Sequence, residues 1–138
     1  MEASLIKKVL DRIDETESEL LEFLSDSIKF KSINPDMIDD DISELKDYQE
    51  WTQRKLLSWN IFDDVEIKST DESQPNVIAT LKNHKKGSLI FNGHSDVVPV
   101  TKDQENAWDL GSPWGGEIVD NKICGRGASD MKGGTIAF

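Results

Sequence analysis

The sequence has little of several features that define whole classes of proteins. It contains one cysteine, Cys124, which excludes an internal disulfide. Lys and Arg number 16 against 27 Asp and Glu, and a formal net charge of −11 repels nucleic acid and anionic lipid. No apolar run approaches the roughly 18 residues of a membrane-spanning helix, and the first residues lack the basic and apolar regions of a secretory signal. We therefore expect a cytoplasmic protein with no nucleic acid partner and no membrane partner.

What the chain does contain suits one modest globular domain. Its 138 residues are 36% hydrophobic, which is enough for a single core. Apolar residues recur at steps of three and four from Leu5 to Phe30, and this spacing predicts a long amphipathic helix with one buried stripe, capped by Ser4. We interpret the stripe as core, because a sheet follows that needs covering; the alternative is a partner-binding surface.

The elements that follow are predicted from caps, alternation and turn residues. Asp41 is a candidate N-cap, and Glu44 three residues later completes a capping box for a helix that runs to about Trp59. The remaining predictions are strands at 65–67, 77–82 and 88–91, a turn at 83–87, an ordered loop at 100–116, a hairpin at 117–124 and the start of a helix at 135–138.

Two motifs carry the candidate chemistry. The first, Asn92-Gly93-His94-Ser95-Asp96-Val97-Val98-Pro99, follows the predicted strand at 88–91, and ligands bind beyond the carboxyl ends of strands in open sheets. In an extended chain His94 and Asp96 share a face, so the carboxylate can accept one ring proton and leave the other ring nitrogen free for a metal. The second motif, residues 125–134, provides Asp130, a hard oxygen ligand on a glycine-rich loop.

Each half of this pattern has a simpler explanation when taken alone. A His-x-Asp sequence arises often by chance, and glycine-rich loops more often mark turns. The second motif lacks the third glycine of a dinucleotide fingerprint and the Gly-Lys-Ser/Thr ending of a phosphate loop. The two long motifs in this order nevertheless favour a metal site formed in part by His94 and Asp130.

The pair GHSDVVP at 93–99 and GRGASDMKGG at 125–134 resembles the zinc-dependent family of acetylornithine deacetylase, succinyl-diaminopimelate desuccinylase, aminoacylase and carboxypeptidase G. The intervening Trp108 and Ser112-Pro113-Trp114 also stand where the family has a Trp and a Pro-aromatic pair. The chain departs from the family pattern at Trp114, Asn121 and Cys124, where Phe, Gly and an aromatic residue are common. None of these departures falls on an expected metal ligand.

The resemblance implies a fold and a metal site. The fold is a three-layer α/β/α sandwich with a mixed sheet, of which residues 1–138 would be the N-terminal portion of the catalytic domain, incomplete at the C-terminus. His94 would bind one of two Zn²⁺ ions, which Co²⁺ can replace, and Asp130 would bridge both. Asp96 would act as a catalytic residue by orienting His94. The general-base Glu, the other metal ligands and a dimerisation domain are expected outside this chain.

The resemblance also implies an activity, the removal of an acyl group from an N-acyl amino acid by a cytoplasmic homodimer, as in acetylornithine deacetylase or succinyl-diaminopimelate desuccinylase. Short peptides are the other substrate class, as in dipeptidases and carboxypeptidases of the family. A non-catalytic truncated fragment that acts as a scaffold, and an acidic interaction module, are the alternatives from other classes. We expect residues 1–138 alone to be inactive. We also expect a trans bond after Asp130, where relatives have a cis bond, or poor order beyond Gly127, because the helix that follows is short. A second copy of the chain packed against the exposed sheet edge would be the exception.

Overall fold

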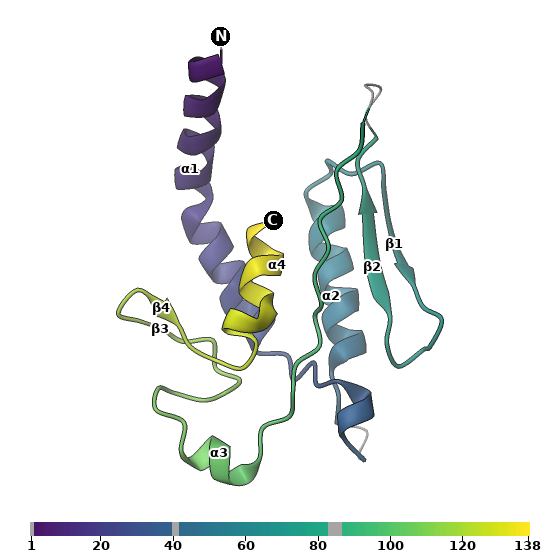
Figure 1. The fold of residues 1–138 in the computed structure, drawn as a ribbon, viewed down its shortest axis with the longest axis vertical. Coiled ribbons are helices and arrows are strands. Elements are labelled where there is room, and N and C mark those ends of the chain that lie inside the picture. Colours follow the sequence, from purple (N-terminus) through teal and green to yellow (C-terminus); the bar gives the residue numbers. More distant parts are fainter. Residues whose placement is uncertain (1, 40–41, 83–86) are drawn as a thin grey trace.

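The computed structural model describes residues 2–39, 42–82 and 87–138 (Figure 1). Helices and two small antiparallel sheets make up these ranges, so the predicted α/β class is confirmed. The elements are α1 (Glu2–Ile28), η1 (Pro35–Met37), α2 (Leu45–Ser58), β1 (Asp64–Lys68), β2 (Asn76–Thr80), α3 (Lys102–Asn106), β3 (Ile118–Val119), β4 (Lys122–Ile123), η2 (Ala128–Lys132) and α4 (Gly133–Ala137).

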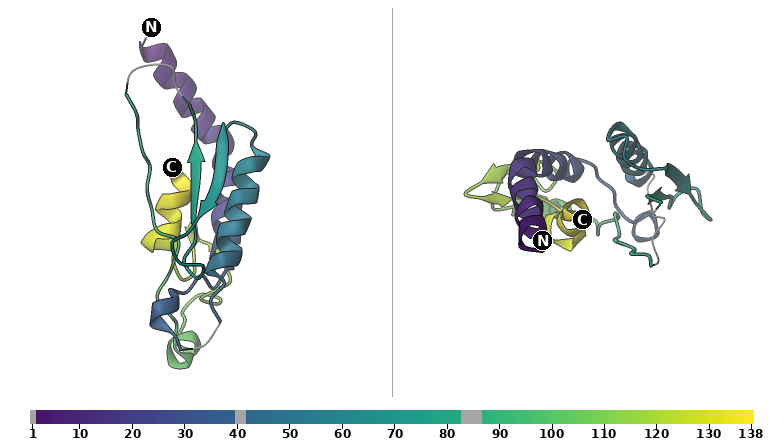
Figure 2. Two further views of the ribbon diagram at one scale, coloured as in Figure 1. Left: turned by 90° about the vertical axis from the view of Figure 1, so that its right-hand side faces the viewer. Right: turned by 90° about the horizontal axis from the view of Figure 1, so that it is seen from above.

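The predicted first helix is present as α1, but its start and its burial differ from the prediction. The helix already includes Glu2 and Ala3, which are good helix formers, so Ser4 lies inside it and is not the N-cap. The buried stripe is confirmed only toward the C-terminal end, where Phe23 and Ile28 are buried. The apolar side chains of the N-terminal half are exposed, because no described element packs over them (Figures 1 and 2).

An aromatic cluster joins the C-terminal end of α1 to α2. Phe30 lies 5.6 Å from Tyr48 and 5.3 Å from Trp51, measured between ring centroids. Phe23 lies 4.9 Å from Trp51 in the same cluster. Offset and edge-to-face contacts at these distances stabilise a core beyond the area that they bury. Tyr48, at the centre of the cluster, is buried, so these rings form the core between the two helices.

Helix α2 packs against the β1–β2 hairpin, which pairs antiparallel from Asp64 with Thr80 to Lys68 with Asn76 (Figure 2). The helix begins at Leu45, and the predicted cap Asp41 lies outside the described residues. The Glu44 side chain does not cap α2. It accepts a hydrogen bond from the Lys31 main-chain N–H at 2.8 Å, which ties α2 to the segment after α1.

The predicted strand at 88–91 is wrong. Within the described residues this segment is extended but pairs with no other strand, and its apolar side chains Leu89, Ile90 and Phe91 are exposed. A strand needs a partner ladder, and among the described residues β2, the nearest strand in sequence, pairs with β1 and with no other segment. The predicted turn at 83–87 lies outside the described residues except for Gly87.

The C-terminal elements agree better with the sequence. Strands β3 and β4 form the predicted hairpin, and its two turn residues Asp120 and Asn121 have φ of 49° and 59°, a conformation that Asn and Asp tolerate. The expectation of a trans bond after Asp130 is wrong, because the bond to Met131 is cis. Nor is the segment after Gly127 loose, since the Lys132 main-chain N–H donates to the Gly127 carbonyl at 2.9 Å.

Helix α4 lies beside the lower part of α1, and both stand apart from the α2–hairpin unit at the top of Figure 1. The two parts meet below through the aromatic cluster, where Phe23 of α1 contacts Trp51 of α2 and the adjoining Trp59. Among the helices in the described ranges, none combines the length and apolarity required to cross a membrane.

Candidate metal centre

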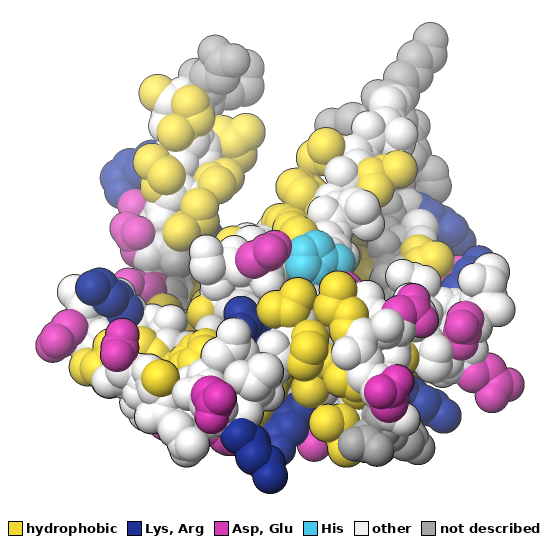
Figure 3. Space-filling model, turned by 60° about the horizontal axis from the view of Figure 1, so that its bottom comes forward, with side chains coloured by type: hydrophobic (Ala, Val, Ile, Leu, Met, Phe, Trp, Pro, Cys, Tyr) yellow, Lys and Arg dark blue, Asp and Glu magenta, His cyan; other side chains and the backbone are white. Residues whose placement is uncertain are grey.

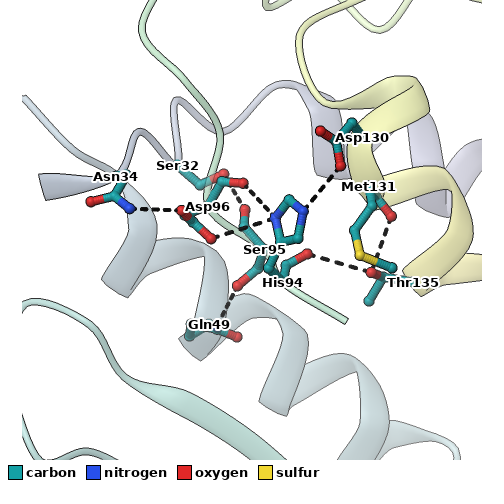
Figure 4. Close-up of polar contacts among 9 residues, drawn as sticks. All are labelled: Ser32, Asn34, Gln49, His94, Ser95, Asp96, Asp130, Met131 and Thr135. Carbon is teal, nitrogen blue, oxygen red and sulfur yellow. Dashed lines mark hydrogen bonds and ion pairs between the residues drawn. The ribbon is translucent and has the colours of Figure 1, made fainter. Parts of the chain in front are cut away.

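The first motif is held in an extended conformation by the segment that follows α1. Ile33 and Val97 form a parallel bridge, in which the Val97 N–H donates to the Ser32 carbonyl at 2.9 Å and the Asn34 N–H donates to the Val97 carbonyl at 3.0 Å. The Ser32 hydroxyl donates to the Ser95 carbonyl at 2.8 Å, and the Gln49 amide donates to the Ser95 hydroxyl (Figure 4). These bonds fix the backbone that follows the candidate ligand His94.

The His94 ring lies between the two predicted carboxylates (Figure 4). Its Nδ1 donates to the Asp96 main-chain carbonyl at 3.0 Å, and Nδ1 is 3.5 Å from Asp96 Oδ1. Its Nε2 is 3.0 Å from Asp130 Oδ1. A proton fixed on Nδ1 leaves Nε2 as the atom that can bind a metal. The structure therefore brings all three sequence-predicted site residues together on one side of the chain.

Asp96 reaches the ring differently from the prediction. The shorter contact comes from the Asp96 main-chain carbonyl. The Asp96 carboxylate is turned toward Asn34 instead, because Oδ2 accepts a hydrogen bond from the Asn34 side-chain amide at 2.9 Å. The same Asn34 side chain accepts a bond from the Asp36 N–H, which fixes the orientation of the amide. Asn34 thus restrains Asp96, and Asp96 restrains His94.

The second motif approaches the first through Gly127. Its φ of 88° lies in the left-handed region, and a Cβ atom at this position would lie 2.7 Å from Val97 Cγ1. Only glycine permits both this conformation and this approach without strain. The contact brings Asp130 opposite His94, with an Asp130 side chain that is 88% exposed. The expectation that glycines let this loop come close is confirmed at this position.

The charges around His94 favour its protonated form. Burial lowers the pKa of His94, but the hydrogen bonds to the Asp96 carbonyl and the Asp130 carboxylate, together with both negative charges, raise that pKa above its usual 6.5. A metal cation would benefit from the same acceptors, because it takes the place of the proton between Nε2 and Oδ1. The site is therefore electrostatically suited to a cation.

The site opens into a shallow pocket lined by both motifs, with residues His94, Asp96, Val97, Val98, Gly125, Arg126, Gly127, Ser129 and Asp130. In Figure 3 the histidine lies at the surface next to an acidic side chain, with hydrophobic side chains around it. The predicted ordered loop reaches this pocket, since the Trp108 ring lies 5.7 Å from the Arg126 guanidinium carbon. Within the described ranges no group of three or more His, Cys, Asp or Glu residues could hold a metal ion.

Sequence reasoning missed the residues that support the site. Ser32, Asn34 and Gln49 hold the first motif, and Lys132 holds the second, yet none was singled out. Asn34-Pro35 carried a signal only for a break in the helix. The sequence around Lys132 gives no signal that its side chain is buried, because burial depends on which elements pack against it.

Comparisons with known proteins agree with the hydrolase family that the two motifs resemble. Residues 90–138 match the family model described as Peptidase family M20/M25/M40, which covers both motifs. The resemblance to this hydrolase family is confirmed over that part of the chain. No solved structure matches the chain.

Several of the matching relatives are named succinyl-diaminopimelate desuccinylase. The protein from Aliarcobacter butzleri is 37% identical over 120 residues, which are 86% of this chain and 28% of the relative. The one from Rhodospirillum centenum is 50% identical over 54 residues, 39% of this chain and 13% of the relative. One from Cereibacter sphaeroides is 56% identical over 48 residues, 35% of this chain and 12% of the relative. The chain thus spans between 12% and 28% of the length of these curated relatives.

Proposed function

We propose that this chain provides part of the dinuclear zinc centre of an amidohydrolase, with His94 and Asp130 as ligands and Asp96 as the group that orients His94. The carrying observation is the 3.0 Å distance between His94 Nε2 and Asp130 Oδ1, two ligand atoms from motifs far apart in sequence. Two ligands bound to one tetrahedral zinc at about 2.0–2.1 Å lie about 3.3 Å apart. The observed pair fits this spacing with little movement.

The roles of the residues follow from their hydrogen bonds. His94 keeps its proton on Nδ1 through the Asp96 carbonyl and directs Nε2 toward Asp130. The carboxylate of Asp130 is exposed, so its second oxygen is accessible to a second cation. When bound, zinc or cobalt would supply Lewis-acid chemistry for an amide carbonyl. The remaining ligands and the general base are expected from residues that this chain does not contain.

The substrate that we propose is an N-acyl amino acid, in particular N-succinyl-diaminopimelate, because the similar relatives are named for that reaction. An acetylornithine-type substrate and short peptides are the alternatives within the family. A cytoplasmic homodimer in amino-acid biosynthesis, and a three-layer sandwich with a mixed sheet around the described elements, belong to the same proposal.

Metal binding by the 138-residue chain tests the site. Titration calorimetry with Zn²⁺, and visible absorption with Co²⁺, should show weak binding that His94→Ala and Asp130→Ala both abolish. A closed site takes three or four protein ligands, so two ligands give low affinity. Asp47→Ala, which removes an exposed carboxylate from α2, is the matched control and should bind as the unmodified chain does.

The same preparation should release no succinate from N-succinyl-diaminopimelate above the level of His94→Ala. Metal binding that persists unchanged in His94→Ala and Asp130→Ala would refute the ligand assignment. Succinate release that depends on His94 would show instead that residues 1–138 are sufficient for catalysis.

A further inference from the structure

Lys132 is buried in a way that is unusual for a lysine. Its exposed fraction is 0%, although lysine is almost never fully buried unless it has partners. Its Nζ donates to the main-chain carbonyls of Ser27 at 2.7 Å and Phe30 at 3.1 Å. The same Nζ lies 4.6 Å from the centre of the Tyr48 ring. These partners come from the end of α1 and from α2, so one side chain contacts both helices.

The two carbonyl acceptors explain why a lysine suits this position. Ser27 is in the last turn of α1, where carbonyls lack intrahelical donors and carry the negative end of the helix dipole. Phe30 lies just beyond the helix end. Lys132 therefore caps α1 from more than a hundred residues away along the chain. A buried carbonyl without a donor is costly, so losing either bond would destabilise the contact between η2 and α1.

The segment that Lys132 holds also supports the other half of the candidate site. Ser32 and Asn34 bond to Ser95 and Asp96 of the first motif. Lys132, two positions after Asp130, attaches the second motif to Ser27 and Phe30. Residues 27–34 are thus a common anchor, and the distance between His94 and Asp130 depends on both attachments.

Protonation of the amine does not decide this attachment. Burial lowers the pKa of Lys132 to about 7, and the negative charge of Glu44 opposes that shift. The ammonium and the neutral amine each have at least two N–H groups, and two carbonyls accept them. The inference therefore rests on geometry.

We propose that Lys132 is a positioning residue for the metal centre, which fixes η2 against the end of α1 so that the Asp130 carboxylate faces His94. That a metal binds at this site is part of the proposed function, on which this proposal rests. The attachment of η2 to α1 is a property of the chain without metal, and it can be measured separately.

Lys132→Met removes the donors and keeps an unbranched side chain of similar length, and Lys122→Met is the matched control at an exposed lysine. Loss of a group that orients a metal ligand lowers metal affinity by about 10–100-fold. We expect a Zn²⁺ affinity at least tenfold weaker in Lys132→Met, unchanged affinity in Lys122→Met, and partial recovery in Lys132→Arg. Far-ultraviolet circular dichroism should show that the β1–β2 unit and α1 persist.

Amide hydrogen exchange gives the readout that needs no metal. In the unmodified chain, the Lys132 amide should open together with amides of the last turn of α1, because one side chain joins the two segments. In Lys132→Met, amides of η2 should lose protection while amides in β1 and β2 keep theirs. If the Lys132 amide of the unmodified chain exchanges well before the amides in the last turn of α1, the proposal is overturned. This test uses the unmodified chain only, so it holds even if Lys132→Met does not fold.

Retained η2 protection with unchanged metal affinity in Lys132→Met would overturn it as well. If the unmodified chain binds no Zn²⁺, the proposed function fails, and the exchange pattern still decides whether Lys132 holds the loop.

Discussion

The two ends of α1 have the same apolar spacing and opposite surroundings. At the C-terminal end Ser27 and Ile28 are fully buried. In the N-terminal half Leu5, Ile6, Val9, Leu10 and Ile13 are between 53% and 64% exposed. A period of three and four residues predicts which face of a helix is apolar. Whether that face is covered depends on elements from elsewhere in the chain.

The difference between the two ends lies in their long-range contacts. At the C-terminal end, the Ser25 hydroxyl donates to the Gly116 carbonyl at 2.8 Å, and Gly125 approaches Ile28 so closely that a Cβ would lie 2.3 Å from Ile28 Cγ2. In the N-terminal half, Lys7 forms an ion pair with Asp11, one turn away on the same helix. We therefore expect stability to be concentrated at the C-terminal end, where the candidate site is anchored.

The largest expected effect comes from matched truncations at the two ends. Ile28→Ala should lower the free energy of unfolding by about 3–4 kcal/mol, because it removes a fully buried side chain and leaves a cavity. Ile6→Ala removes an exposed side chain and favours the helix slightly, so we expect a change within about 0.5 kcal/mol. Urea unfolding measures both. Equal losses would show that the N-terminal half is covered in solution.

The pH dependence of stability tests the burial of Tyr48 between α1 and α2. Burial raises the pKa of Tyr48 from 10.0 to about 12, and the nearby Thr52 and Ser27 hydroxyls oppose this shift. Between these values the unfolded chain loses the phenolic proton and the folded chain keeps it, so stability falls as the pH rises. The loss attributable to Tyr48 should reach about 2 kcal/mol between pH 9 and pH 12.

Tyr48→Phe is the control for that measurement, since it cannot ionise and shares every other titrating group. Its stability relative to the unmodified chain should therefore improve over the same pH interval. A difference between the two proteins that stays constant from pH 9 to pH 12 would contradict a buried Tyr48 hydroxyl.

The smallest expected effect concerns the exposed ion pair of the N-terminal half. Lys7 Nζ lies 2.7 Å from Asp11 Oδ2, but exposed pairs four residues apart in a helix contribute only about 0.3–0.5 kcal/mol. Lys7→Ala should therefore change the unfolding free energy by less than about 0.5 kcal/mol in thermal or urea unfolding. A loss comparable to that of Ile28→Ala would remove the contrast between the two ends.

Much of the local structure could be predicted from short sequence patterns. Helices α1 and α2, strands β1 and β2, and the β3–β4 hairpin follow from spacing and turn residues, and Asp120 and Asn121 adopt the left-handed conformation expected of the turn. Helix α3 was not predicted, because its range was interpreted as an ordered loop. The prediction of a strand at 88–91 was wrong, because an apolar run forms a buried strand only where another strand pairs with it. Ser4 failed as a cap because the helix continues through good helix formers before it.

The sequence by itself determined which residues carry the candidate chemistry. His94, Asp96 and Asp130 stand within two contiguous motifs, and residues two apart in an extended segment share a face by backbone geometry alone. Tertiary structure decided how they meet. The carboxylate of Asp96 turns to Asn34, and Lys132 binds the end of α1, through contacts between residues separated by 62 and more than a hundred positions. A pattern along the chain does not contain such contacts, because they depend on which surfaces the folded chain brings together.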